Sequence, residues 1–433
     1  MNLIKKFKQS IRCGTGEAYL ILQQQPNLDV YKYIKKAILK PHAYDPQSEG
    51  DRAYYLMQFI DLSPQKEQLI AVVLKGLKKE KKDTWALVQL FRLAEILAKR
   101  GNQKAWVAIY NRYHRKTIHG SKWCGEDSIL ALDGIEGLKY IAHVRGRALS
   151  KDKDDWETSF TLDRFQEENP NINVIESLKN AAENRPLINV YLKAIQKTKA
   201  RWSEAAAKRK PFVYNYQNIK EAIEQPRFFI ASPKLKNLSK ATIKQLSDDF
   251  EQEDRSDIQK KYLRIFSRIP FQNGHRFLLN YAKNQQDAWP TELACEALSF
   301  FQHKKIRKFA LKQLKNSKNP IIHLPLLISN YKKGDWKLLV TIAKEHDDDD
   351  DIHNLVIHFW TIYDKNKTKE CLVPLEVIYR KLTCGIHRLG LVKLLWKRKV
   401  LSKKIQKELE FDSNEKIRKF YSKIKNKRAK KLS

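Results

Sequence analysis

Glycine and proline are scarce in this chain, with 14 of each among 433 residues. An all-β or Rossmann-type chain of this length would carry more glycine for its turns. The phosphate-binding and hydrolase motifs GxxxxGK[ST], GxGxxG, HExxH and GxSxG are also absent. The sequence therefore predicts helices joined by short polar turns, and it argues against NTPase, nicotinamide-dependent, metalloprotease and α/β-hydrolase chemistry.

Cysteine is also infrequent, and its five positions form no CxxC pair: Cys13, Cys124, Cys295, Cys371 and Cys384. An odd, scattered set is neither a disulfide framework nor a zinc ribbon, and it fits a reducing compartment. The basic N-terminal stretch has no continuous apolar region behind it, and no apolar run approaches the roughly 18–20 residues that span a bilayer. We therefore expect a cytoplasmic protein that does not enter a membrane.

Positive charge is what the chain has in excess. Lysine and arginine number 84 against 49 acidic residues, a formal net charge of +35. Such a charge attracts polyanions, whether nucleic acid, anionic lipid or acidic protein. Because lysine greatly outnumbers arginine, a compositional bias of the source genome is an open alternative to a binding function.

Helical periodicity is clear through the first part of the chain. The apolar residues recur at the i, i+3, i+4, i+7 spacing with which a helix buries one stripe. Ser63-Pro64 and Asp83-Thr84 are predicted helix starts, and Gly101 stands where a C-terminal glycine belongs. The stripes are Val30, Ile34, Ala37 and Ile38; Ala53, Leu56, Met57 and Ile60; Leu69, Val72, Val73 and Leu77; Leu87, Leu90, Phe91, Ala94 and Ala98; and Trp106, Ile109, Tyr110 and Tyr113.

A chain of this length needs several domains or a repeat array. The short connections favour antiparallel helical neighbours. We expect an N-terminal helical repeat segment at 1–145, a less regular segment with longer loops at 146–260, C-terminal helical repeats at 261–415 and a basic tail at 416–433.

An internal echo supports a repeat. Ile306-Arg307-Lys308-Phe309 recurs as Ile417-Arg418-Lys419-Phe420, and an acidic, polar turn precedes the second copy. This pattern resembles HEAT repeats. The resemblance implies an all-α fold of antiparallel helical hairpins stacked as a HEAT-like α-solenoid, in which stacked Asp and Arg side chains can form a ladder.

Two basic clusters with interleaved aromatic residues are the candidate nucleic-acid-binding sites. Residues 193, 197 and 201 share one helix face, and a row of cations about 6 Å apart can follow a phosphate backbone while an indole stacks on a base. The alternative for the first cluster is an exposed helix with a half-buried tryptophan. The alternative for the second cluster is a solvated helix at the C-terminus. The candidates are Lys193, Lys197, Arg201, Trp202, Lys208, Arg209 and Lys210, and then Lys416, Arg418, Lys419, Lys423, Lys425, Lys427 and Arg428.

Two further groups of polar residues are weaker candidates. Asp347 to Asp351, with nearby histidines, fit a helix N-terminus better than a metal site, because adjacent aspartates cannot all face one ion. Around Trp123, a polar constellation lacks the spacing of a known zinc or Cys–His site; it comprises His114, His119, Cys124, Glu126, Asp127 and Asp133. The nearby Gly134 and Gly137 predict close helix packing or a break. We therefore expect no metal and no cofactor.

Three functions stay open at this level. The first is a non-enzymatic solenoid with a basic surface that binds nucleic acid or another polyanion. The second is a protein–protein interaction scaffold whose lysines are compositional background. The third follows from the HEAT resemblance, because some HEAT-like solenoids are DNA glycosylases that remove alkylated bases; that activity would need Trp85, Trp106, Trp123 or Trp202 in a positive cleft beside a lone carboxylate.

Overall fold

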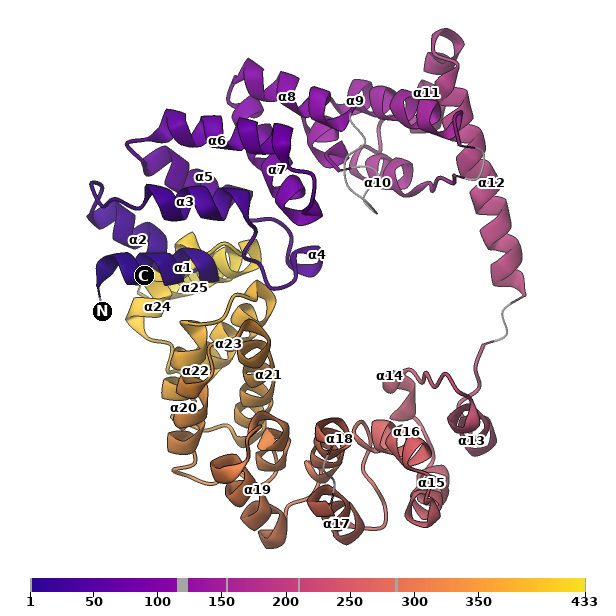
Figure 1. The fold of residues 1–433 in the computed structure, drawn as a ribbon, viewed down its shortest axis with the longest axis vertical. Helices are drawn as coiled ribbons and strands as arrows, with labels where there is room; N and C mark the ends of the chain where they lie inside the picture. The colour runs from indigo at the N-terminus through magenta and orange to yellow at the C-terminus, as the bar shows by residue number, and fades with distance from the viewer. Residues whose placement is uncertain (1, 115–123, 153–154, 209–210, 285–286, 433) are drawn as a thin grey trace. The chain divides into compact units, whose positions relative to one another are not determined.

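A computed structural model describes residues 2–114, 124–152, 155–208, 211–284 and 287–432 (Figure 1). All regular structure in these ranges is helical, without a strand, and this confirms the all-α prediction. Among the described residues, no helix combines the length and the apolar content that crossing a bilayer would require. The chain forms two compact units: residues 1–210 with 411–413, and residues 211–410 with 414–433.

The first unit contains twelve helices among its described residues. Each packs mainly on helices close to it in the sequence: α6 on α7 and α8, α7 on α9, and α9 on α12. The helices are α1 (Leu3–Cys13), α2 (Glu17–Gln24), α3 (Tyr31–Leu39), α4 (Pro46–Glu49), α5 (Ala53–Leu62), α6 (Lys66–Lys79), α7 (Thr84–Lys99), α8 (Gln103–Tyr113), α9 (Glu126–Leu149), α10 (Phe160–Glu168), α11 (Val174–Asn184) and α12 (Leu187–Ala207).

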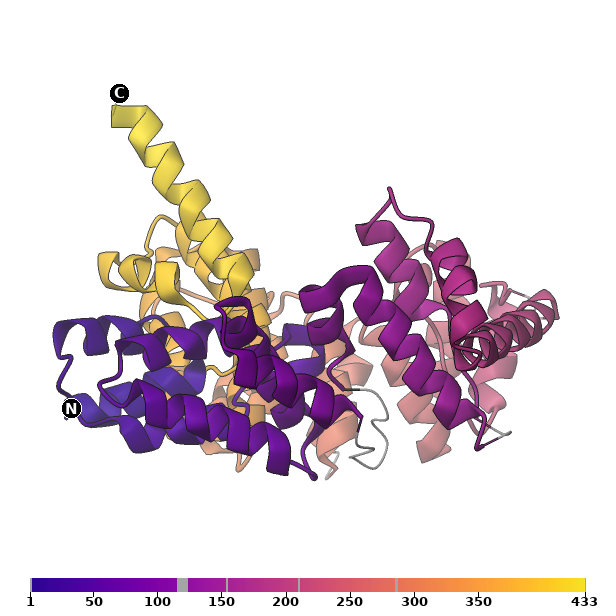
Figure 2. The same ribbon diagram turned by 90° about the horizontal axis from the view of Figure 1, so that it is seen from above.

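The second unit is built in the same way. Here α18 packs on α16 and α17, and α21 packs on α22 and α23. Figure 2 shows the last helix, α25, as one continuous rod. The helices are α13 (Tyr216–Glu224), α14 (Ser232–Leu235), α15 (Lys240–Gln252), α16 (Ser256–Phe266), α17 (His275–Asn284), α18 (Ala288–Leu298), α19 (Lys304–Asn316), α20 (Trp336–Glu345), α21 (Asp349–Asn366), α22 (Leu372–Tyr379), α23 (Gly385–Lys397), α24 (Lys403–Glu408) and α25 (Glu415–Leu432), with 3-10 turns at Ile321–Leu327, Lys369–Cys371 and Leu409–Phe411.

Most of the helix-end signals act as predicted. Asp83 caps α7 by accepting the backbone N–H groups of Trp85 and Ala86, and Gly101 follows α7 with a φ of +91°. The predicted helix start at Ser63-Pro64 is wrong by two residues, because α6 begins at Lys66. There the Ser63 hydroxyl accepts the backbone N–H of Gln65, a local turn that competes with the helix.

Glycines shape α9, the longest helix of the first unit. Gly134 has φ 51° and ψ −124°, so the helix is broken there, as the sequence suggests. Gly146 lies against the start of α12, where an added Cβ would come within 1.8 Å of the Leu187 carbonyl oxygen. Only glycine permits this approach of α9 to α12, the helix that carries the first basic cluster.

Candidate nucleic-acid interface

Helix α12 is buried on one face in its first half only. Its buried stripe is formed by Ile188, Tyr191, Leu192, Ile195 and Thr198, and it packs on α9 and α11. From Lys199 to Ala207 every residue is exposed. In Figure 1 the C-terminal half of α12 extends past α9 and α11. The last two turns of α12 are therefore exposed and not packed on other helices.

Lys193, Lys197 and Arg201 are exposed on the side of α12 opposite to its buried stripe. None of the three side chains forms an ion pair with a carboxylate among the residues that the structure describes. Lys208 is also exposed, directly after the helix. Of the other predicted members of this cluster, Arg209 and Lys210 lie outside the described residues. The row predicted from the spacing is therefore present, and it forms no ion pair with a described acid.

Trp202 continues the buried stripe of α12 beyond the point where packing ends. It meets Trp156 from the segment between α9 and α10, with ring centroids 5.9 Å apart and planes inclined by 58°. The two side chains keep 49% and 55% of their surfaces exposed. The sequence analysis missed Trp156, although an exposed tryptophan after the charged run Lys151 to Asp155 is a signal that could have singled it out.

A small hollow of about 280 Å³ is lined by Trp156 of the tryptophan pair. Lys197 and Arg201 of α12 line the same hollow. Asp152 and Asp155 also contribute, so the charge of the hollow itself is mixed. An aromatic surface beside two cations can hold a planar base while its phosphate meets the cations.

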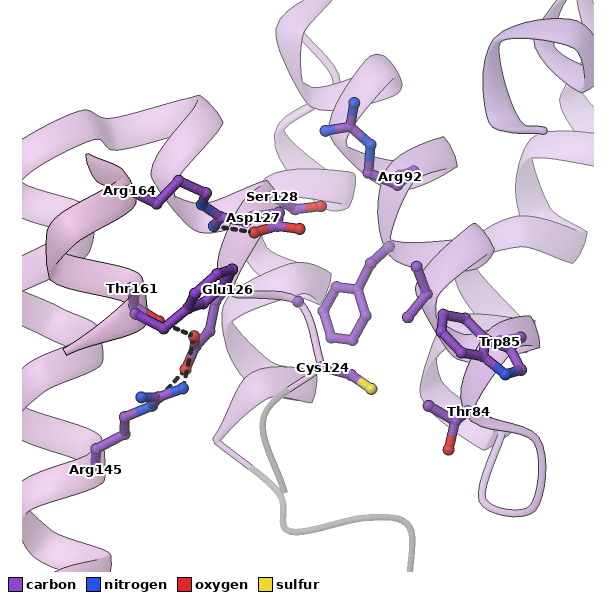
Figure 3. A pocket seen from close by; sticks show the side chains of 14 residues that line it. Thr84, Trp85, Arg92, Cys124, Glu126, Asp127, Ser128, Arg145, Thr161 and Arg164 are labelled. Atoms are coloured by element: carbon purple, nitrogen blue, oxygen red, sulfur yellow. Dashed lines mark hydrogen bonds and ion pairs between the residues drawn. The ribbon is translucent and has the colours of Figure 1, made fainter. Parts of the chain in front are cut away.

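A buried ionic network anchors the segment that carries Trp156. The Arg145 guanidinium donates to Glu126, with Nη2 2.8 Å from Oε2, and its Nη1 lies 2.8 Å from Oε1 of Glu157, the residue after Trp156. Tyr113 also donates to Glu126, as does Thr161 (Figure 3). Burial raises the pKa of Glu126, and the Arg145 charge opposes that rise. The network fixes the backbone next to Trp156.

The polar constellation around Trp123 does not come together as a site. Its acids have separate partners: Glu126 binds Arg145, Asp127 binds Arg164, and Asp133 accepts from Trp106 and Tyr110. His119 and Trp123 lie outside the described residues, and His114 is exposed. The remaining side chain, Cys124, is half-buried at a pocket beside α7 (Figure 3).

That pocket also contains Trp85, together with Arg92, Asp127 and Arg164. Arg164 contacts Asp127, and Arg92 contacts Glu95 and lies 3.5 Å from Asp51. The two carboxylates that line this pocket with Trp85, Glu126 and Asp127, are therefore both ion-paired. We therefore propose no catalytic function for this pocket.

The second basic cluster, in the predicted basic tail at 416–433, lies on α25. Ile417 and Ile424 bury one side of it, and Lys416, Lys419, Lys423 and Lys425 are exposed. Two of these lysines have acidic partners: Lys419 lies 2.5 Å from Glu415, and Lys425 lies 4.0 Å from Glu410. Arg418 is half-buried, and the side chains of Lys427 and Arg428 lie outside the described residues. This cluster has no described tryptophan, so the α12 cluster is the stronger candidate.

Comparison with known proteins gives no independent guide to function: no family model matches the chain, and no curated protein matches it.

Proposed function

We propose that this protein is a non-enzymatic, HEAT-like α-solenoid that binds single-stranded nucleic acid through α12 of its first unit. The packing of each helix on helices close in sequence supports the stacked arrangement. The echo at Ile306 and Ile417 supports it too, because both isoleucines are buried in the first turn of a helix.

The observation that carries the binding proposal is the exposed pair Trp156 and Trp202, with Lys197 and Arg201 lining the same hollow as Trp156. Each indole keeps about half of its surface exposed, and base stacking makes use of such surface. A row of cations at i, i+4 and i+8 supplies the electrostatic part of the affinity. Duplex DNA, whose bases are already stacked, can use the cations but not the indoles.

The test is binding of the full chain to labelled single-stranded RNA, single-stranded DNA and duplex DNA across a salt series. We expect the single strands to bind more tightly than the duplex, with affinity falling steeply as salt rises. Binding that is absent near physiological salt would overturn the proposal. A protein partner whose binding is insensitive to salt would favour the interaction scaffold instead.

Two variants separate the cations from the indoles. Replacing Lys193, Lys197 and Arg201 together by alanine should reduce the slope of log affinity against log salt by about 2, at roughly 0.7 per phosphate contact. Trp202→Ala should leave the slope unchanged and weaken single-strand binding roughly 5- to 150-fold, the value of stacking one base.

Matched controls come from the same chain. Lys5, Lys104 and Lys179 are exposed lysines on α1, α8 and α11, and replacing all three removes the same charge elsewhere on the first unit. Trp289 on α18 is 49% exposed, as Trp202 is. If these controls weaken binding as much as the α12 variants do, the interface is not on α12. A chain ending at Glu415 measures the contribution of α25 separately.

A further inference from the structure

Three potential metal ligands meet where α21 packs on α23 in the second unit. They are His353 of α21, Cys384 directly before α23, and His387 in the first turn of α23. Their donor atoms all lie within 4.8 Å of one another. Cys384 Sγ is 3.2 Å from His387 Nδ1, and the two imidazole rings stand perpendicular with centroids 4.4 Å apart.

Helix geometry explains how the sequence assembles this group. Cys384 is the N-cap residue of α23 and His387 is the third residue of the helix, a spacing that brings an N-cap side chain beside the N3 position. The third ligand comes from the facing helix. The two helix starts are tied by a hydrogen bond from the Thr383 hydroxyl to Asp349, with the oxygens 3.0 Å apart. Asp349 precedes His353 by one turn, so this bond keeps His353 next to Cys384.

We propose that His353, Cys384 and His387 bind a zinc ion. One thiolate and two imidazoles form the mixed sulfur and nitrogen set that Zn²⁺ prefers, whereas Mg²⁺ and Ca²⁺ require oxygen ligands. Bonds of about 2.0–2.3 Å to a tetrahedral ion would place the donor atoms roughly 3.3–3.5 Å apart. Cys384 Sγ and His387 Nδ1 already lie 3.2 Å apart, and the other donor distances, all within 4.8 Å, need to close by at most about 1.5 Å. Three protein ligands leave the fourth position to water.

Access and charge agree with a cation at this position. Cys384 is buried, but both imidazoles are half-exposed, so an ion can reach the group from solvent. The first turn of α21 is acidic, with Asp349, Asp350 and Asp351. These aspartates do not form the ligand cage that the acidic run first suggests; Asp348 caps α21 and Asp349 accepts from Thr383. They add negative charge next to the ligands.

The alternative is a hydrogen-bonded Cys–His pair with an edge-to-face imidazole packed on it. The chain contains a comparison for this case in Cys295 and His323, whose Sγ and Nδ1 lie 3.5 Å apart. Both residues are buried, and no third metal-ligating side chain joins them within the described ranges. A Cys–His contact by itself therefore does not require a metal.

The experiment uses the untagged full-length chain, freed of metal by dialysis against a chelator. Zn²⁺ is titrated in competition with a chromogenic chelator, and Co²⁺ is added separately as a spectroscopic substitute. We expect one equivalent of Zn²⁺, and with Co²⁺ a thiolate-to-metal charge-transfer band together with the visible bands of tetrahedral cobalt. Binding should weaken as pH falls, because protons compete for the ligands.

Cys384→Ser, His353→Ala and His387→Ala should each lower zinc affinity by at least roughly 10- to 100-fold. That is the cost of losing a residue that only hydrogen-bonds to a metal ligand. Cys295→Ser and His323→Ala should bind zinc as the unmodified chain does. Less than a tenth of an equivalent bound by the unmodified chain, or no thiolate–cobalt band, overturns the proposal whether or not the variants fold. A zinc affinity that is unchanged in the His353→Ala and His387→Ala variants also overturns the proposal.

Discussion

Gly146→Ala measures how strongly the first unit depends on the close approach of α9 to α12. Alanine is favoured over glycine inside a helix by about 1 kcal/mol, so helix propensity alone predicts stabilisation. Here, however, the new Cβ would lie 1.8 Å from the Leu187 carbonyl oxygen and 2.7 Å from its carbonyl carbon. These are backbone atoms, which cannot rotate away, so the overpacking cost should reach or exceed the upper end of its usual range, about 3 kcal/mol.

The expected net effect is a loss of about 2 kcal/mol or more. For a unit of roughly 210 residues this lowers the melting temperature by about 4–8 °C. Circular-dichroism melts provide the assay. Gly390→Ala on α23 is the control, because its nearest neighbouring atom is 3.8 Å away in Trp360. That variant should melt at or slightly above the temperature of the unmodified chain. A Gly146→Ala protein that melts as high as the unmodified one would refute the packing argument.

Three more predictions concern buried groups. Arg145→Met removes the ion-pair partner of two buried glutamates, Glu126 and Glu157. It should lower the free energy of unfolding, measured in urea, by about 3–5 kcal/mol. A loss below about 1 kcal/mol would contradict this. In the folded chain Cys124 should react with a thiol reagent far faster than the other four cysteines, because these are buried. Burial also raises the pKa of the Cys371 thiol to about 11. A second thiol that reacts as fast as Cys124 would contradict the burial of the other cysteines. Burial lowers the pKa of His358 to about 4 from the ordinary 6.5. Its neutral form therefore stabilises the fold above pH 6.5, and this stability is lost as pH falls from about 6.5 to 4. The urea midpoint should therefore fall less steeply between pH 6.5 and 4 in His358→Leu than in the unmodified chain.

Much of the helical structure could be predicted because it is encoded locally. The stripe of Leu87, Leu90, Phe91 and Ala94 is buried, as its spacing requires. Asp83 and Gly101 act at the two ends of that helix as their chemistry predicts. The error at Ser63-Pro64 has the same local origin, because a serine that precedes a helix can form a turn with its own neighbours as readily as a cap.

Prediction of the site was limited by contacts between distant residues. The row of Lys193, Lys197 and Arg201 follows from helical spacing alone. Trp156 does not, because its contact with Trp202 depends on the packing of α9 on α12 and on the ion pair between Arg145 and Glu157. Sequence spacing could suggest a half-buried Trp202, but not the second indole that covers it.

The metal-ligand group illustrates the same limit. The spacing of Cys384 and His387 is visible in the sequence, but two ligands on one helix turn are not enough for a site. His353 belongs to another helix, and the aspartates next to it in the sequence suggest oxygen ligands instead. Only the packing of α21 on α23 brings the third ligand to the other two.

The pairing of charges distinguishes a binding surface from a lysine-rich background. A genome-wide preference for lysine accounts for exposed lysines such as Lys193 and Lys197, wherever they occur. It does not account for Arg201. Some arginines of the described chain hold carboxylates, as Arg307 does with Asp335 at 2.7 and 2.8 Å, but the exposed Arg185, Arg227 and Arg276 form no ion pair with a described acid. Arg201 also forms no ion pair with a described acid, and it lines a hollow together with the exposed Trp156. Because a guanidinium can bind a phosphate through two hydrogen bonds and stack on a base, this arginine is the feature of α12 that composition explains least and nucleic-acid binding explains best.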